Sequence, residues 1–124
     1  MVYKVFIPEN CPSSKNGKVW TGKRLVWSKA AQKYRKKVAT YLEENSVEFR
    51  KHIDKEELPA IVHFKFVRGT KHQFDYVNPL QTILDLMVEH NWIPDDNSDV
   101  ILPVFEPYEY NKECPGVEIS LIST

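Results

Sequence analysis

The stretch FDYVNPLQTILDLMVEHNWIPDDNSD, residues 74–99, holds a helix pattern between one aspartate, Asp75, and a group of three, Asp95, Asp96 and Asp99. Asn78 suits a helix N-cap, and Pro79 at the first helical position gives up no hydrogen bond. Pro94 forbids continuation, so the helix should end near residues 90–91. We therefore expect an amphipathic helix that buries one face. Its apolar residues recur at i, i+3, i+4, i+7 and i+8: Leu80, Ile83, Leu84, Met87 and Val88.

Strand patterns lie on both sides of this helix. Residues 60–67 (AIVHFKFV) are rich in β-branched and aromatic residues, which favours a strand. Residues 100–105 and 116–122 are expected to be strands as well, separated by an acidic turn that contains proline. Near the N-terminus, residues 2–7 alternate between apolar and polar positions and predict another strand.

The segment between the first strand and residue 60 predicts a hairpin and a second helix. Residues 18–27 (KVWTGKRLVW) suggest two short strands around a TGK turn. Ser28 is a good N-cap for the helical pattern of residues 28–44, and residues 45–59 predict a short helix or a loop. The expected buried positions of the first helix are Ala30, Ala31, Tyr34, Val38, Tyr41 and Leu42.

This order of elements predicts an α+β fold: a single domain over residues 1–124, with a mixed β-sheet, an N-terminal hairpin and two main helices. A content of 42% hydrophobic residues is enough for a core. No run approaches the ~20 apolar residues that cross a bilayer, so we expect no membrane partner, and the first residues do not suggest a signal peptide. Cys11 and Cys114 form no CxxC motif, and we expect them to be reduced.

The net charge of zero conceals two oppositely charged segments. Residues 1–42 contain ten Lys or Arg and one acid, whereas residues 72–118 contain ten acids and one base. A basic surface attracts phosphates, so we favour DNA contact. The alternatives are that the two segments neutralise each other in the fold, or that they serve self-association. The expected DNA-binding residues are Lys15, Lys18, Lys23, Arg24, Lys29, Lys33 and Lys36.

The acidic residues suggest a metal site if they come together. Asp75 precedes the predicted helix, whereas Asp95, Asp96 and Asp99 follow it. A helix of this length is about 20 Å long, so the two groups meet only if the chain returns, for example through a neighbouring strand. Clustered carboxylates would favour Mg²⁺ or Mn²⁺, which can activate water near a phosphodiester. Alternatively, these are ordinary turn residues and Asp85 is a solvated helix residue.

The pattern D-x-x-N-x-x-Q-x-x-x-D-L, followed by W-x-x-D-D-N, resembles the RusA family of Holliday junction resolvases. The N-terminal part is similar too, with a strand ending in Ile-Pro, the loop PSSKNGK, a hairpin and the segment SKAAQKYRKKV. The resemblance covers about residues 2–104. The positions that carry the motif are Asp75, Asn78, Gln81, Asp85, Trp92, Asp95 and Asp96.

The resemblance implies a homodimeric, Mg²⁺- or Mn²⁺-dependent endonuclease that cuts four-way DNA junctions in a bacterial or phage-infected cytoplasm. It implies that Asp75 and Asp96 are catalytic carboxylates, with Asp95 as a further candidate. The implied metal ligands come from Asp75, Asp85, Asp96 and Asp99.

Two positions depart from the family pattern. Val77 stands where the family has a third carboxylate, and Gln81 stands where it has a lysine. Two functions therefore stay open: a junction-cutting endonuclease, and a branched-DNA-binding protein with a weakly active or inactive site. Trp20, Trp27 and Phe74 are candidates for stacking on exposed bases, with core or dimer packing as the alternative for the two hairpin tryptophans.

Overall fold

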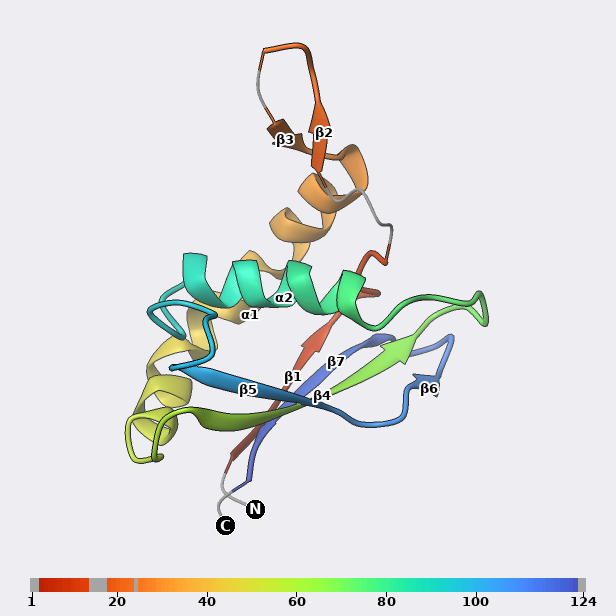
Figure 1. The fold of residues 1–124 in the computed structure, drawn as a ribbon. Helices are drawn as coiled ribbons and strands as arrows, with labels where there is room; N and C mark the ends of the chain where they lie inside the picture. Colours follow the sequence, from red (N-terminus) through yellow and green to blue (C-terminus); the bar gives the residue numbers. More distant parts are fainter. Residues whose placement is uncertain (1–2, 14–17, 24, 123–124) are drawn as a thin grey trace.

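The computed structural model describes residues 3–13, 18–23 and 25–122, and the side chains of residues 18–20 and 25–27 lie outside that description. One mixed sheet has the strand order β1 (Tyr3–Pro8), β7 (Gly116–Leu121), β4 (Ala60–Arg68) and β5 (Ile101–Phe105) (Figure 1). The short strand β6 (Glu109–Tyr110) also pairs with β4. β7 runs antiparallel to β1 and β4, whereas β5 and β6 run parallel to β4. This mixed sheet with two helices confirms the predicted α+β fold class.

The unit β4–α2–β5 decides where the acidic residues lie. Because β4 and β5 are parallel, the chain must cross back over the sheet between them, and α2 (Val77–Glu89) is that crossover. The register pairs Ala60 with Ile101 and Phe64 with Phe105. Figure 1 shows the two loops that flank α2 at opposite ends of the helix.

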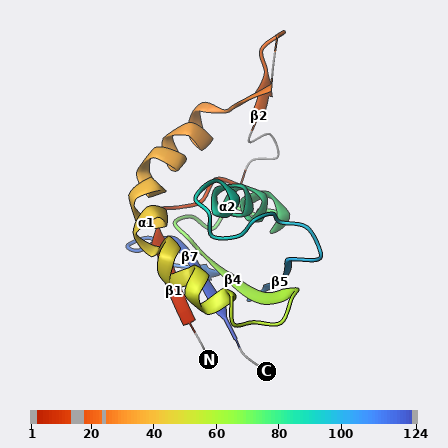
Figure 2. The same ribbon diagram turned by 90° about the vertical axis from the view of Figure 1, so that its left-hand side faces the viewer.

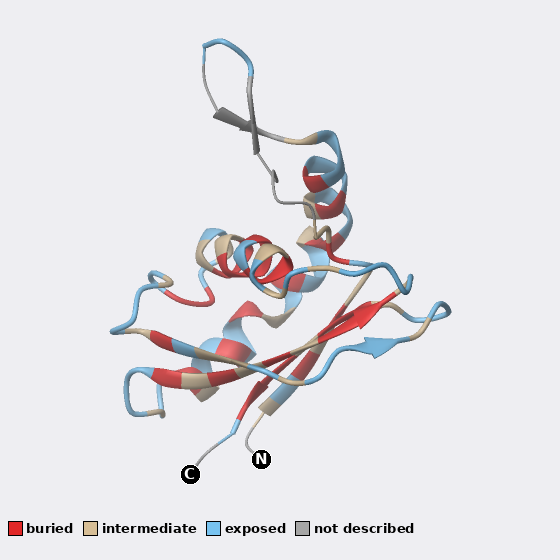
Figure 3. Cartoon of the chain, turned by 45° about the vertical axis from the view of Figure 1, so that its right-hand side comes forward, coloured by how far each residue is buried: buried red, intermediate tan, exposed pale blue. Residues whose placement is uncertain are grey.

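A single core fills the space between the sheet and the two helices (Figure 3). Alternate residues of the strands point into it, so that Val62, Phe64 and Phe66 of β4 are fully buried, as their alternation predicts. The other sheet face carries ion pairs instead, including Lys4–Glu118 at 3.3 Å. Both helices therefore lie on one face of the sheet. Neither has the length and apolar content to cross a bilayer, as far as the described chain extends.

Helix α1 (Lys29–Ile53) is longer than the sequence pattern predicts. Its 25 residues give a length of about 37 Å, and they include most of the segment expected to be a short helix or a loop. The helix continues because Ser46, Phe49 and Ile53 extend its buried stripe. Ser28 caps the start as predicted, and its Oγ accepts a hydrogen bond from the N–H of Ala31 at 3.2 Å.

Two residues of α1 that were expected in the core lie outside it. Ala30 is exposed, and Tyr41 has 41% of its surface accessible. Ala30 belongs to the first turns of α1, which extend beyond the sheet together with the hairpin of β2 (Lys18–Trp20) and β3 (Leu25–Trp27) (Figures 1 and 2). The hairpin is a separate two-stranded sheet, as predicted. We call the hairpin and the first two turns of α1 the arm.

The ends of α2 differ from the predicted caps. The helix begins at Val77, and the N-cap position is Tyr76, which makes no side-chain cap. The predicted cap Asn78 lies in the first turn instead, with its N–H donating to the carbonyl of Asp75 at 3.0 Å. The prediction of Asn78 as the N-cap was therefore wrong. The backbone carbonyl of Asp75 accepts a hydrogen bond from the start of the helix, where a side-chain cap was expected. Side-chain propensity cannot predict such a backbone contact.

A Schellman motif ends α2. Asn91 adopts a φ of 62°, and its N–H donates to the carbonyl of Val88 at 3.2 Å. The N–H of Trp92 reaches back to the carbonyl of Met87 at 2.8 Å. The helix thus ends at this motif and not at Pro94, and the chain turns sharply toward α1.

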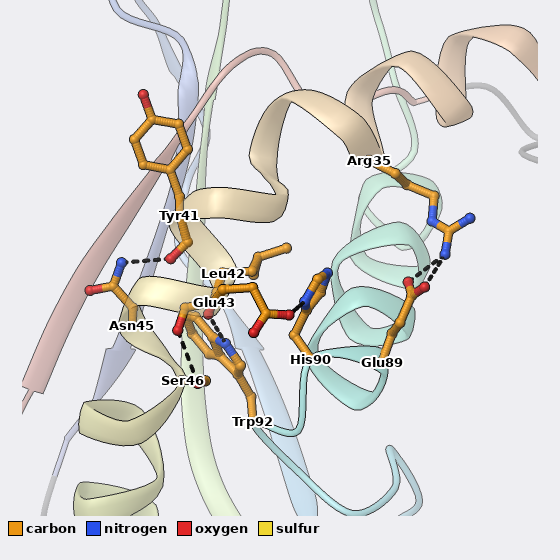
Figure 4. Close-up of polar contacts among 9 residues, drawn as sticks. All are labelled: Arg35, Tyr41, Leu42, Glu43, Asn45, Ser46, Glu89, His90 and Trp92. Atoms are coloured by element: carbon orange, nitrogen blue, oxygen red, sulfur yellow. Dashed lines mark hydrogen bonds and ion pairs between the residues drawn. The ribbon is translucent and has the colours of Figure 1, made fainter.

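Side chains fasten this turn to α1 (Figure 4). Trp92 is buried, packs on Phe49 at a ring-centroid distance of 4.6 Å, and donates from Nε1 to the carbonyl of Leu42 at 2.8 Å. Two ion pairs lie beside it, between Glu43 and His90 and between Arg35 and Glu89. The loop that carries the Asp-Asp pair is therefore anchored on the middle of α1.

Candidate functional site

Asp75 lies in the segment that joins the end of β4 to the start of α2. Its side chain is exposed and makes no hydrogen bond or ion pair with any described residue. The neighbouring Phe74 packs under the guanidinium of Arg68, the last residue of β4. This contact holds Asp75 near the C-terminal end of β4.

Asp95 stabilises the turn that follows α2. Its two carboxylate oxygens accept hydrogen bonds from the N–H of Asp96 and from the side-chain amide of Asn97, both at 2.8 Å. These hydrogen bonds favour the ionised carboxylate and lower the pKa of Asp95. The Asn97 side-chain oxygen in turn accepts from the N–H of Asp99 at 2.9 Å. Asp95 is therefore a turn residue, which was the alternative considered for these acids in the sequence. Asp96 is half-buried, and Asp99 is exposed.

The middle of α2 presents polar groups to solvent. Gln81 donates from its side-chain amide to Asp85 at 2.8 Å. Val77, one turn earlier, has 62% of its surface exposed. We call Val77, Gln81, Asp85 and Glu89 the outer face of α2, because they follow one another at four-residue intervals.

The structure does not bring Asp75 together with Asp95, Asp96 and Asp99 within one protomer. The next strand does lie beside β4, as considered above, but it runs parallel. The carbonyl of Val100 accepts from the N–H of Ala60 at 2.9 Å, so the Asp-Asp turn lies at the start of β4. Asp75 follows the far end of that strand, which has 9 residues and is about 26 Å long. Throughout the described ranges, no three or more His, Cys, Asp or Glu side chains are grouped to hold a metal ion.

All four predicted DNA-binding side chains that the structure describes are exposed on the arm and on α1. Lys23, Lys29, Lys33 and Lys36 are exposed, and no described carboxylate lies within 4.0 Å of their ammonium groups. Lys15 and Arg24 fall outside the described residues, as does the side chain of Lys18.

Mutual neutralisation accounts for little of the charge asymmetry. Among the described side chains, two ion pairs join residues 1–42 to residues 72–118, namely Lys4–Glu118 and Arg35–Glu89. Lys37 pairs with Glu9 inside the basic segment, at 3.5 Å. The described lysines of the arm, Lys23, Lys29 and Lys33, are therefore presented to solvent.

The sequence patterns missed an aromatic and basic group beside Asp75. Tyr76 and Tyr108 pack around Phe74, at 5.2 and 5.3 Å between ring centroids. Lys71 approaches the ring of Tyr110 at 5.0 Å. The signal was present as two segments in which aromatic and charged residues alternate, KHQFDY and EPYEY, but they are far apart in the sequence.

No family model matches the chain, and a search of curated proteins found no relative. The described residues define an α+β protein with an exposed basic arm, an acidic group at each end of α2, and an aromatic group beside Asp75.

Proposed function

We propose that this protein binds branched DNA and cuts four-way junctions as a homodimeric, metal-dependent endonuclease similar to the RusA family, in a bacterial or phage-infected cytoplasm. The observation that carries the proposal is the row of exposed lysines on the arm and on α1, Lys23, Lys29, Lys33 and Lys36, without carboxylate partners in the described chain. Such a row suits a polyanionic backbone. The motif that links Asp75 to Asp95 and Asp96 supports cutting.

The proposal needs two protomers to assemble each cutting site, because one protomer keeps its acids at opposite ends of α2. A two-fold axis through the outer face of α2 reverses the helix, so that Asp75 of one copy lies beside Asp96 of its partner. Val77 then becomes an interface residue, which suits its exposed apolar side chain. A two-fold dimer also presents two sites to the two related strands of a junction.

The residues that would hold the metal are Asp75 from one protomer with Asp96 and Asp99 from the other. These are oxygen ligands, which fit Mg²⁺ or Mn²⁺ better than zinc. When bound, such an ion supplies Lewis-acid stabilisation of the phosphate and a more acidic water. Asp95 keeps the turn that carries Asp96 in shape through its two hydrogen bonds, and the lysines of the arm hold the backbone.

A cleavage assay on a synthetic four-way junction with Mg²⁺ or Mn²⁺ tests the proposal. We expect paired nicks from the wild-type protein and at least a hundredfold loss in Asp75→Asn and in Asp96→Asn. Asp54→Asn, at the exposed end of α1, is the matched control and should keep full activity. Unchanged cutting by both site variants would rule out this mechanism, and failure to bind any DNA at low salt would favour self-association as the role of the charges.

A second function, junction binding without efficient cutting, is favoured by one observation. The position of the family's third carboxylate is an exposed valine, Val77, and the position of its lysine is Gln81, which is bonded to Asp85. This function predicts salt-sensitive binding in EDTA and no nicking with any divalent metal. The double variant Val77→Asp, Gln81→Lys should then gain cutting, whereas continued inactivity of that variant would count against a lost site.

A further inference from the structure

A pocket of about 550 Å³ opens beside Asp75, between the segment from Lys71 to the start of α2, the loop residue Ser13 and the segment after β5. Its wall contains aromatic rings, a hydroxyl, amides, a carboxylate and basic groups. A volume in the range of about 300–1,000 Å³ is typical of sites for small ligands or single ligand groups. The residues used below are Ser13, Lys71, His72, Phe74, Asp75 and Tyr108.

The aromatic part of the pocket is held in place by its own packing. Phe74 meets Tyr108 edge to face, at 5.3 Å and 87°, and meets Tyr76 at 5.2 Å and 64°. The N–H of Tyr108 donates to the hydroxyl of Tyr76 at 3.1 Å. Phe74 is half-buried between these rings, whereas 45% of the surface of Tyr108 is accessible. Tyr108 is therefore the ring positioned to receive another flat group.

A buried positive charge lies directly behind this wall. Arg68 is 5% exposed, and its guanidinium lies 4.6 Å from the ring centroid of Phe74. It donates to the carbonyl of Cys11 at 2.6 Å and to Ser13 Oγ at 3.1 Å, while its buried Nε has no hydrogen-bond partner. No carboxylate of the described chain lies within 4.0 Å of it. A buried cation without a counter-charge is costly, and an anion in the pocket would offset that cost.

Basic groups at the rim complete the features that a nucleotide requires. Lys71 and His72 are exposed on the lining, on the same segment as Asp75. The pocket thus combines a half-exposed ring for a base with two rim residues that favour a phosphate, and the guanidinium behind its wall adds positive charge. Among the described residues of the lining, Asp75 is the single acid.

We propose that this pocket binds one unstacked nucleotide of a DNA strand, with the base against the ring of Tyr108 and the phosphate toward Lys71 and His72. The inference rests on the proposed function, since it takes DNA as the partner, and it names the part of the DNA that is bound beside Asp75. A free nucleotide has the same chemistry, and the experiment below separates the two sources. Base stacking on an aromatic side chain is worth about 1–3 kcal/mol, a factor of roughly 5–150 in affinity.

The experiment compares binding of four labelled probes at low salt in EDTA: a four-way junction, a fully paired duplex, a 15-nucleotide oligothymidylate, and thymidine monophosphate. The variants are Tyr108→Leu, Tyr108→Phe and Lys71→Gln, and the matched control is Tyr41→Leu, which removes a tyrosine of similar exposure from α1. We expect Tyr108→Leu to weaken the oligothymidylate and the junction about tenfold and the duplex less than twofold. Tyr108→Phe and Tyr41→Leu should bind like the wild type.

A second readout, the fluorescence of a base analogue, does not depend on the variant Tyr108→Leu. An oligonucleotide with a single 2-aminopurine should lose fluorescence when its base stacks on Tyr108, and the loss should persist in Tyr108→Phe. Equal weakening of duplex and single strand, or no weakening by Tyr108→Leu while DNA still binds, overturns the pocket and leaves DNA binding intact. Absence of DNA binding in the wild type overturns the proposed function with it. Tight binding of thymidine monophosphate without the oligonucleotide overturns the DNA strand as the source.

Discussion

At the scale of single residues, the packing fixes a few positions by space alone. Gly116 begins β7 and pairs with Pro8 and Val67 on its two neighbouring strands. A Cβ at this position would lie 2.3 Å from Cζ of Phe6 and 2.5 Å from the carbonyl oxygen of Ile7. The first contact is with a side chain, but the second is with backbone that cannot move without breaking the sheet.

Gly116→Ala should therefore destabilise the protein by about 1–3 kcal/mol. Urea unfolding followed by tryptophan fluorescence measures the change in the free energy of unfolding. Gly69→Ala is the control, because the nearest atoms to its Cβ would lie at an ordinary 3.6 Å. Equal stability of the two variants would contradict the packing described for β7.

The two cysteines should differ sharply in reactivity. Both are free, but Cys11 is buried and Cys114 is exposed. Burial raises the pKa of the Cys11 thiol to about 12, so almost none of it is thiolate at pH 8. A disulfide reagent at pH 8 should label one thiol in the native protein and two after unfolding, as counted by mass spectrometry. Rapid native labelling of both thiols would show that Cys11 is accessible.

The same pKa predicts a loss of stability in alkali. Because the folded pKa of Cys11 is raised above its ordinary value of 9.0, the associated stabilisation is complete below pH 9 and declines as the pH rises toward 12. Cys11→Ala should show a smaller decline over this window, as measured by urea unfolding at several pH values. The pKa of the buried Tyr34 is raised too, first by burial and then by Cys11, so Tyr34 adds a decline of its own and Cys11→Ala should remove part of that decline as well.

At the scale of elements, the end of α2 depends on one left-handed residue. Asn91 at φ 62° allows the Schellman hydrogen bonds that turn the chain toward Trp92. Asn91→Val should cost about 1–2 kcal/mol, because a branched side chain is strained in this conformation. Asn91→Gly should be as stable as the wild type or more so, and thermal unfolding of the three proteins compares them. A harmless valine would mean that α2 ends in another way.

The basic row on α1 should contribute to DNA binding through counterion release. Replacing Lys29, Lys33 and Lys36 with Gln should lower the slope of log affinity against log salt by up to about 0.9 for each lost phosphate contact. Replacing Arg50 and Lys51 with Gln, at the other end of the same helix, is the control and should leave the slope unchanged. Equal effects at both ends would indicate attraction by overall charge rather than by this surface.

The elements themselves were largely predictable, because their signals are local. Alternation predicted β1, β4 and the buried face of β4, and the apolar spacing predicted α2. The end of α1 was missed because a buried polar residue such as Ser46 gives no apolar signal. The strand β6 was missed because Glu109 pairs with Val67 of β4, which is distant in sequence. Whether the acids converge within one protomer was equally unpredictable, because no local pattern indicates whether β5 runs parallel or antiparallel to β4. The parallel pairing separates Asp75 from Asp96 in one chain. The pocket beside Asp75 was also missed, because its lining comes from three distant segments.

At the scale of the whole molecule, the proposed two-protomer site predicts complementation between inactive variants. A mixed dimer of Asp75→Asn and Asp96→Asn protomers would contain one site with both substitutions and one intact site. After co-refolding, about half of the dimers are mixed, so about a quarter of the sites should cut. The junction assay should then show single nicks rather than paired ones. No recovery on mixing would place both acids in one protomer's site, contrary to the separation along β4.

The hydrogen bond between Trp92 and Leu42 connects the surface proposed to bind DNA with the turn proposed to bind a metal ion. The exposed lysines lie on α1, and the turn with Asp96 is pinned to the same helix by the indole and by the ion pairs of Arg35 and Glu43. Under the proposed function, a movement of the arm caused by bound DNA should therefore shift the acidic turn as well, because both are attached to helix α1. Binding of the DNA backbone and placement of the Asp96 carboxylate would then be coupled through one helix.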